Sequence, residues 1–122
     1  MAADCGQTIN PYSVSFKYVS TADEFSTSRF RVELRRGSYN GGVWVWLRVT
    51  TRYASNLMMG TTEFLSTPCG KVTGLPYGWG NNRTPNSSRC SKAICLGQPA
   101  SVTTVTYGGG GEERSKSKKV RV

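Results

Sequence analysis

The chain has 122 residues, enough for one domain with a modest core, and its 16 basic and 7 acidic side chains give a net charge of +9. It contains no histidine and its carboxylates form no catalytic pair, so we expect neither an enzyme nor a bound cofactor. No stretch approaches the roughly 20 apolar residues of a membrane span, and the N-terminus lacks the regions of a signal peptide. The excess positive charge favours an anionic partner.

Abundant glycine, serine and threonine, together with short aliphatic stretches, predict an all-β fold: an antiparallel sheet of about five to seven strands with few or no helices. A first strand is expected at 12–19, where Val14, Phe16 and Tyr18 alternate with polar side chains. The polar and acidic residues 20–27 are expected to form a loop. The N-terminal part is thus predicted to add one half-buried strand to the sheet.

Residues 28–53 predict the centre of the sheet, two long strands joined by a glycine-rich turn at 37–42. Side chains alternate across a strand, so one face of this hairpin is aliphatic and the other mixes arginines with tryptophans. The second face comprises Arg29, Arg31, Arg35, Trp44, Trp46, Arg48 and Arg52, with Glu33 among them.

This basic and aromatic face has two interpretations. Arginines side by side on neighbouring strands destabilise a sheet unless an anion compensates them, and one Glu33 cannot balance five guanidinium groups. The face therefore favours nucleic acid, with the arginines on phosphates and Trp44 or Trp46 near bases. Tryptophans in alternation are also typical of a packed core, and for these two side chains that interpretation stays open.

The rest of the chain predicts a strand at 57–66, an irregular connection at 68–89 and a last strand at 101–107. A β domain over 1–107 is thus followed by a glycine hinge and a basic C-terminal tail over 108–122. The tail either only solubilises the protein or binds the same polyanion, with a salt-dependent gain for each neutralised phosphate. Its candidate contacts are Lys116, Lys118, Lys119 and Arg121.

Four cysteines, Cys5, Cys69, Cys90 and Cys95, could form two disulfides in three possible connectivities. Cys90 and Cys95 flank a loop of hairpin-turn length, so they could pair with each other or with the same loop on a neighbouring subunit. A zinc site is disfavoured because the chain has no histidine and no CxxC pair. No metal is therefore expected.

Three stretches are similar to the coat proteins of single-stranded RNA bacteriophages. STAD at 20–23 precedes RFRVELRRGSYNGGVWVWLRV, which resembles the long central hairpin of that family. CSKAIC at 90–95 resembles the short cysteine-bounded loop with which some members crosslink neighbouring subunits. Members of the family normally end in two helices that clasp the partner subunit, whereas the C-terminal third of this chain predicts loop, strand and tail.

By this resemblance the protein is expected to be a capsid protein, made in the host cytoplasm and incorporated into the virion. It would dimerise through its sheet, assemble into a closed shell and hold genomic RNA against the basic face. Its partners are then RNA and further copies of the chain, with no membrane and no small-molecule substrate.

The alternative is a secreted, disulfide-stabilised β-sandwich that binds carbohydrate or an anionic surface. In that case Met1 replaces a removed leader, and Cys5–Cys69 and Cys90–Cys95 are the bridges. The sugar-stacking platform would consist of Trp44, Trp46, Tyr77 and Trp79. In the coat-protein hypothesis the arginines are the main functional residues. In the β-sandwich hypothesis the tryptophans and cysteines take that role.

Overall fold

A computed structural model describes residues 5–26, 30–51, 55–60, 64–67, 70–72, 77–82, 88–97, 104–107 and 118–121. These residues form twelve β-strands and no helix, and all strand pairs are antiparallel. The strands are β1 (Thr8–Ile9), β2 (Lys17–Ser26), β3 (Phe30–Tyr39), β4 (Gly42–Thr51), β5 (Ser55–Gly60), β6 (Phe64–Thr67), β7 (Gly70–Val72), β8 (Tyr77–Asn82), β9 (Ser88–Cys90), β10 (Ala93–Gly97), β11 (Thr104–Tyr107) and β12 (Lys118–Arg121). The predicted all-β fold is confirmed. None of the described segments is a helix of the length and hydrophobicity required to cross a membrane.

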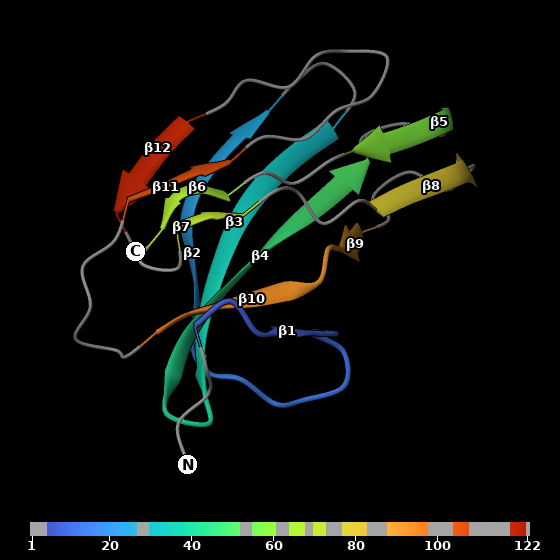
Figure 1. Ribbon diagram of the computed structural model, residues 1–122. Helices are drawn as coiled ribbons and strands as arrows, with labels where there is room; N and C mark the ends of the chain where they lie inside the picture. The colour runs from blue at the N-terminus through green and yellow to red at the C-terminus, as the bar shows by residue number, and fades with distance from the viewer. Residues whose placement is uncertain are drawn as a thin grey trace.

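The main sheet holds the central hairpin in its interior (Figure 1). Its strands lie in the order β1-β10-β4-β3-β2, and β9 pairs with a further stretch of β4. A second sheet has the order β12-β11-β6-β7, and β5 pairs with β8. Strand β2 is therefore one edge of the main sheet, and β3 and β4 are interior strands.

Strands β3 and β4 are joined by Asn40 and Gly41 alone. Both residues have positive φ, 49° and 75° respectively, as a type I′ turn requires. Asparagine and glycine tolerate this conformation, and the twist of the turn matches that of the strands. The register is unbroken from Phe30 opposite Thr51 to Tyr39 opposite Gly42. The hairpin predicted from the sequence is confirmed, but its turn is shorter than the predicted 37–42, because Gly37, Ser38 and Tyr39 belong to β3.

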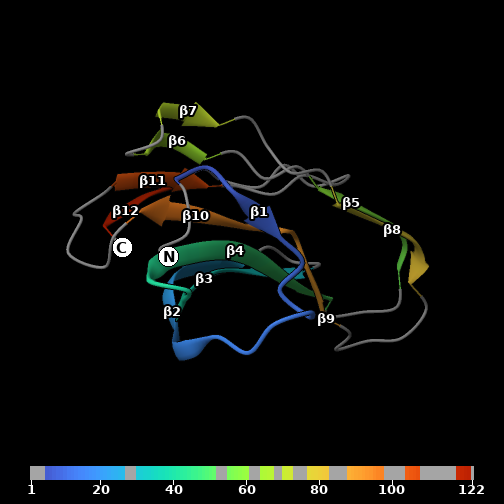
Figure 2. The ribbon, with the colours of Figure 1, turned by 60° about the horizontal axis from the view of Figure 1, so that its bottom comes forward.

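Both faces of the main sheet are covered at least in part. Figure 2 shows the second sheet on one side of it and the chain between β1 and β2 on the other side. Since that chain segment packs on the tryptophans, as described below, the second sheet lies over the aliphatic side. The buried aliphatic residues there are Val32, Leu34, Val43, Val45, Leu47, Val49 and Ile94.

The segment before the hairpin differs from its prediction. A strand was expected at 12–19 and a loop at 20–27, but β2 begins at Lys17 and continues to Ser26. Pairing with β3 makes these polar residues a strand, although its register shifts between Lys17 and Ser20 and again between Thr21 and Asp23. Non-local backbone hydrogen bonds thus override the local polar composition.

The C-terminal half contains more strand than was expected. The stretch 68–89 was expected to be irregular, yet β7, β8 and part of β9 lie within it. The strand expected at 57–66 is divided between β5 and β6, and the last expected strand is confirmed over β11. The final part of the basic tail, Lys118–Arg121, is β12 and pairs with β11 rather than being solvated along its whole length.

Candidate anion-binding site

The two tryptophans of β4 belong to the core. Trp44 and Trp46 are buried, and Phe16 from the segment between β1 and β2 stacks on Trp46 with ring centroids 4.5 Å apart. The Nε1–H of Trp44 donates a 2.9 Å hydrogen bond to the carbonyl oxygen of Tyr39. Rings enclosed in this way cannot stack on an external ring. The prediction that they lie near bases is wrong, and so is the prediction that they form part of a carbohydrate platform.

Gly37, which lies opposite Trp44 in the strand register, makes this cover possible. A Cβ atom at Gly37 would lie 2.8 Å from the Cβ of Phe16 and 3.2 Å from the ring of Trp46. Any larger residue at this position would push Phe16 away from the sheet. The sequence pattern showed the alternation of Trp44 and Trp46, but it did not show that Phe16 returns to cover them.

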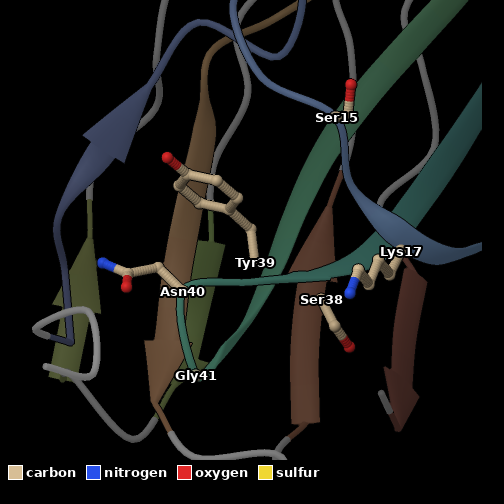
Figure 3. A pocket seen from close by; sticks show the side chains of 6 residues that line it. All are labelled: Ser15, Lys17, Ser38, Tyr39, Asn40 and Gly41. Atoms are coloured by element: carbon tan, nitrogen blue, oxygen red, sulfur yellow. The ribbon is translucent and has the colours of Figure 1, made fainter.

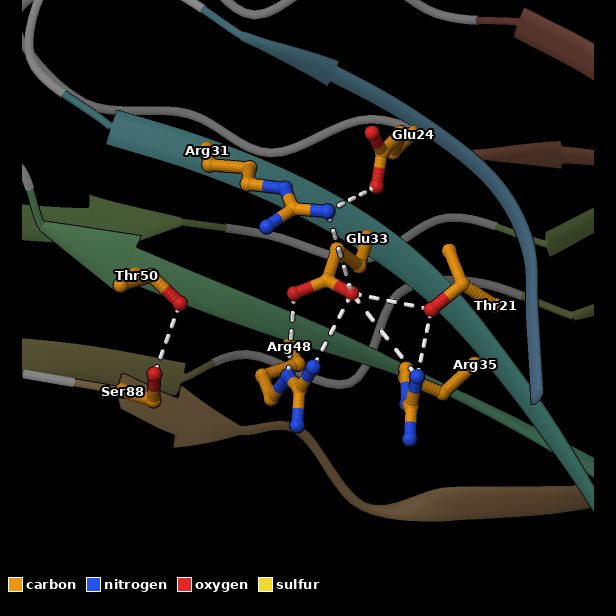
Figure 4. A network of polar contacts seen from close by, with 8 residues as sticks. All are labelled: Thr21, Glu24, Arg31, Glu33, Arg35, Arg48, Thr50 and Ser88. Atoms are coloured by element: carbon orange, nitrogen blue, oxygen red, sulfur yellow. Dashed lines mark hydrogen bonds and ion pairs between the residues drawn. The ribbon is translucent and has the colours of Figure 1, made fainter. Parts of the chain in front are cut away.

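Further along the same face, a buried carboxylate organises the charged residues (Figure 4). Glu33 on β3 is 2% exposed and lies opposite Arg48 of β4. Arg48 donates from Nε to Oε1 and from Nη2 to Oε2, both at 3.0 Å. The hydroxyl of Thr21 on β2 donates to Oε2 at 2.9 Å. Burial of this charge is therefore compensated by a bidentate ion pair and a further hydrogen bond.

Two more guanidinium groups surround the same carboxylate. Arg31 Nη2 lies 3.9 Å and Arg35 Nη1 lies 3.8 Å from Oε2 of Glu33. Arg31 also donates to the carboxylate of Glu24, and Arg35 to the hydroxyl of Thr21. We call the three arginines with Glu33, Glu24 and Thr21 the arginine cluster. Three guanidinium groups face two carboxylates, which leaves one positive charge in excess.

The pKa values of the cluster follow from these contacts. Burial alone raises the pKa of Glu33, but the hydrogen bonds from Arg48 and Thr21 and the charges of Arg48 and Arg31 outweigh it. The net effect lowers the pKa of Glu33 below its usual value. The hydrogen bond to Glu24 and the charge of Glu33 raise the pKa of Arg31. The contacts within the cluster thus favour the charged forms of Glu33 and Arg31.

Two of the three arginines are open to solvent. The side chain of Arg31 is 47% exposed and that of Arg48 is 36% exposed, whereas Arg35 is 19% exposed. A guanidinium group has five N–H donors, and Arg48 directs two of its nitrogens at Glu33. Its Nη1 has no partner among the described residues. The arrangement can therefore offer fixed N–H donors to an external oxyanion.

The cluster contains three of the predicted anion-binding residues. Arg29, Arg52 and Lys116 lie outside the described residues, and Lys118, Lys119 and Arg121 belong to β12 in the second sheet. Thr21 and Glu24 were missed because 20–27 was expected to be a loop. Residues 21–25 have too few apolar side chains at alternate positions to indicate a strand.

The cysteines do not form the predicted bridge at CSKAIC. Neither Cys90 nor Cys95 is part of a disulfide, and Cys95 is buried beside Trp44. Cys90 lies opposite Arg48 and Cys95 opposite Trp44 of the same strand, a separation of about 13 Å at ~3.3 Å per residue. A disulfide requires Cα atoms about 4.4–6.8 Å apart, and a buried Cys95 cannot reach a neighbouring subunit. Cys69 lies outside the described residues, so Cys5–Cys69 stays a prediction.

Within the described part of the chain, no group of three or more metal-ligating side chains comes together. No family model, curated protein or solved structure matches the chain. The resemblance to phage coat proteins therefore stays a hypothesis, and the arginine cluster is the feature from which function is argued.

Proposed function

We propose that this protein is a structural coat protein that assembles with copies of itself and holds RNA through the arginine cluster. The observation that supports this most is the gathering of three guanidinium groups around one buried carboxylate, with the side chains of Arg31 and Arg48 reaching solvent. A phosphate placed there would accept charge-assisted hydrogen bonds from donors that are already oriented.

The buried tryptophans refine the mode of binding. Stacking on aromatic rings supplies part of the affinity of many single-strand-binding surfaces, but Trp44 and Trp46 are not available for it. Contacts from Arg31 and Arg48 to phosphates carry no sequence information. We therefore expect binding that depends on charge and salt rather than on the identity of the bases, as packaging of a long genome requires.

An exposed strand edge supports the assembly part of the proposal. Among the described residues, β2 pairs only with β3 and is thus an edge strand of the main sheet, the position at which a sheet can accept a further strand. Tyr18 at the start of this edge is 81% exposed, and Val19 beside it is exposed as well. Addition of a strand from a second copy would cover both the edge and these apolar side chains.

The first experiment tests assembly and RNA uptake together. The protein is produced in bacteria and analysed by size-exclusion chromatography, electron microscopy and the ratio of absorbance at 260 and 280 nm. Large particles with the absorbance of nucleic acid are expected. A monomer free of nucleic acid would overturn the proposal.

The second experiment tests the site. Binding of a labelled single-stranded RNA with a 5′-hydroxyl end is measured as a function of salt for the wild type, Arg31→Gln and Arg31→Lys. Arg31→Gln is expected to reduce the slope of log K against log salt by about 0.7, the value for one contact to a single strand, and Arg31→Lys to preserve it. Identical slopes for the wild type and Arg31→Gln would exclude Arg31 from the binding surface.

A further inference from the structure

An exposed tyrosine borders the arginine cluster. Tyr12, in the segment between β1 and β2, is 69% exposed. Its hydroxyl accepts a 3.1 Å hydrogen bond from the backbone N–H of Cys90 on β9. Cys90 lies directly opposite Arg48 of β4, and residues directly opposite each other in an antiparallel pair have their side chains on the same face of the sheet. Tyr12 is therefore attached to the sheet beside the arginine that forms the bidentate pair with Glu33.

The electrostatic surroundings of Cys90 agree with this placement. Burial raises the pKa of its thiol, while a hydrogen bond from the hydroxyl of Tyr12 and the charges of Arg48 and Arg35 act in the opposite direction. The thiol is thus near both the tyrosine and the guanidinium groups. Because adjacent strands are about 4.8 Å apart, Arg48 and Arg31 lie one and two strands from β9, about 5 and 10 Å. These separations are comparable with the size of one nucleotide.

The orientation of Tyr12 is the reverse of the usual one. A tyrosine commonly buries its ring and leaves its hydroxyl near water. Here the hydroxyl is bonded to the backbone of β9, and most of the residue is in solvent. Asn10 orders the backbone at Tyr12: its side-chain oxygen accepts a 3.0 Å bond from the N–H of Tyr12, and its carbonyl oxygen accepts one of 3.0 Å from the N–H of Ser13. The side chain is thus held at both ends while much of its surface stays accessible.

The aromatic side chains near the hairpin turn are less suited to meet a ligand of the cluster. Tyr39 packs against Phe16 and Trp44, with ring centroids 5.9 and 6.1 Å away. It lines a pocket of about 230 Å³ at the turn, and the polar side chains around this pocket point in different directions (Figure 3). Tyr18 is exposed but belongs to the end of β2 that is nearest the turn. Among the described residues, Tyr12 is therefore the aromatic side chain best placed beside the cluster.

We propose that Tyr12 is a stacking platform for an unpaired base whose neighbouring phosphate is held by the arginine cluster. This inference rests on the proposed binding of RNA and adds the kind of RNA that the site takes. A planar base would cover exposed ring surface of Tyr12 while a phosphate reaches Arg48 or Arg31. Stacking requires a base that is not already enclosed in a helix, so the site is expected to prefer single-stranded to double-stranded RNA. Every base has a π-face, so this preference needs no particular sequence.

Two ligands and two variants test the proposal. The affinity of the whole protein, freed of RNA at high salt, is measured by fluorescence anisotropy for a labelled oligoadenylate and for an abasic ribose-phosphate oligomer of the same length. Tyr12→Leu removes the ring and the hydroxyl, whereas Tyr12→Phe removes the hydroxyl alone. Tyr12→Leu is expected to weaken binding of oligoadenylate about tenfold, and Tyr12→Phe less than about threefold.

The abasic oligomer is the control for both variants. They are expected to bind it within about twofold of the wild type and with the same salt dependence, because neither substitution removes a charge. Binding of this oligomer also shows that each variant is folded. Since Arg31→Gln is expected to change the salt dependence and Tyr12→Leu is not, the two contributions can be separated.

A loss that is confined to Tyr12→Leu and to oligoadenylate supports the proposal. Equal affinities of the wild type and Tyr12→Leu for oligoadenylate would overturn it and leave the arginine cluster as the RNA site. Equal losses in Tyr12→Leu and Tyr12→Phe would also overturn it, because the hydroxyl rather than the ring would then be responsible. Impaired assembly of Tyr12→Leu with unchanged RNA affinity would make Tyr12 a subunit contact instead. A wild type that bound neither oligomer would overturn the proposed function together with this inference.

Discussion

One face of the central hairpin has two halves of opposite character. Near the turn, Trp44 and Trp46 are sealed beneath Phe16, and at the far end Arg31 and Arg48 surround Glu33 and reach water. The same alternation places both halves on one face of the sheet. What separates them is the neighbouring chain: the segment before β2 covers the aromatic half through Phe16, whereas β2 borders the charged half through Thr21 and Glu24. We therefore place the proposed anion site in the half whose arginine side chains reach solvent.

Disruption of the aromatic half should have the largest effect. Trp46→Ala removes the ring on which Phe16 stacks and leaves a cavity, with an expected loss of about 3–5 kcal/mol in the free energy of unfolding. Urea unfolding followed by circular dichroism measures it. Lys92→Ala removes an exposed side chain and serves as the control, with an expected change within about 0.5 kcal/mol. Equal effects of the two variants would show that Trp46 is not part of the core.

In the charged half, removing one member of the Arg48–Glu33 ion pair should lower the free energy of unfolding more than removing both members. Arg48→Met leaves Glu33 buried without its bidentate partner, and we expect a loss of about 2–3 kcal/mol because the exposed side of Arg48 admits some water. The double variant Arg48→Met with Glu33→Leu should recover most of this loss, since it leaves no buried charge unpaired. The same urea experiment measures both. Additive losses in the double variant would contradict the coupling.

The sequence predicted well what local chemistry determines. Asn40 and Gly41 specify their turn by backbone preference alone, and the alternation of valine and leucine on β4 identifies the buried face. The alternation could not tell which of the larger side chains on the other face are covered. That depends on Phe16, which lies 30 residues from Trp46 in the chain and was expected in an ordinary strand.

The candidate site was predicted only in part for the same reason. The arginines of the hairpin were recognised, but the carboxylate of Glu24 and the hydroxyl of Thr21 that contact them are supplied by β2. Its segment has the composition of a loop and becomes a strand only through pairing with β3. Counting arginines against Glu33 alone therefore overestimated the uncompensated charge of this face.

The pH dependence of stability should distinguish the two halves, because only the charged half titrates. The pKa of Glu33 is lower in the folded protein than in the unfolded chain, so its stabilising contribution is complete above the unfolded value of about 4.3. It is lost as the pH falls through the folded pKa. The difference in unfolding free energy between the wild type and Glu33→Gln should therefore shrink from pH 6 to pH 3. A difference that stays constant would show that Glu33 is not held ionised by the cluster.

The smallest effect on stability should come from the exposed ion pair between Arg31 and Glu24. Breaking this pair is also the most informative test of RNA binding. Glu24→Gln breaks an exposed ion pair with Arg31 and should change the unfolding free energy by less than about 1 kcal/mol. RNA should nevertheless bind about two- to fivefold more tightly, because the carboxylate that competes with phosphate for Arg31 is gone. Asp23→Asn is the matched control, since Asp23 lies opposite Leu34 and faces away from the cluster. If both variants raised the affinity equally, overall charge rather than competition at Arg31 would govern binding. A gain restricted to Glu24→Gln would show that the sheet keeps its arginines ordered with an internal carboxylate until a phosphate replaces it.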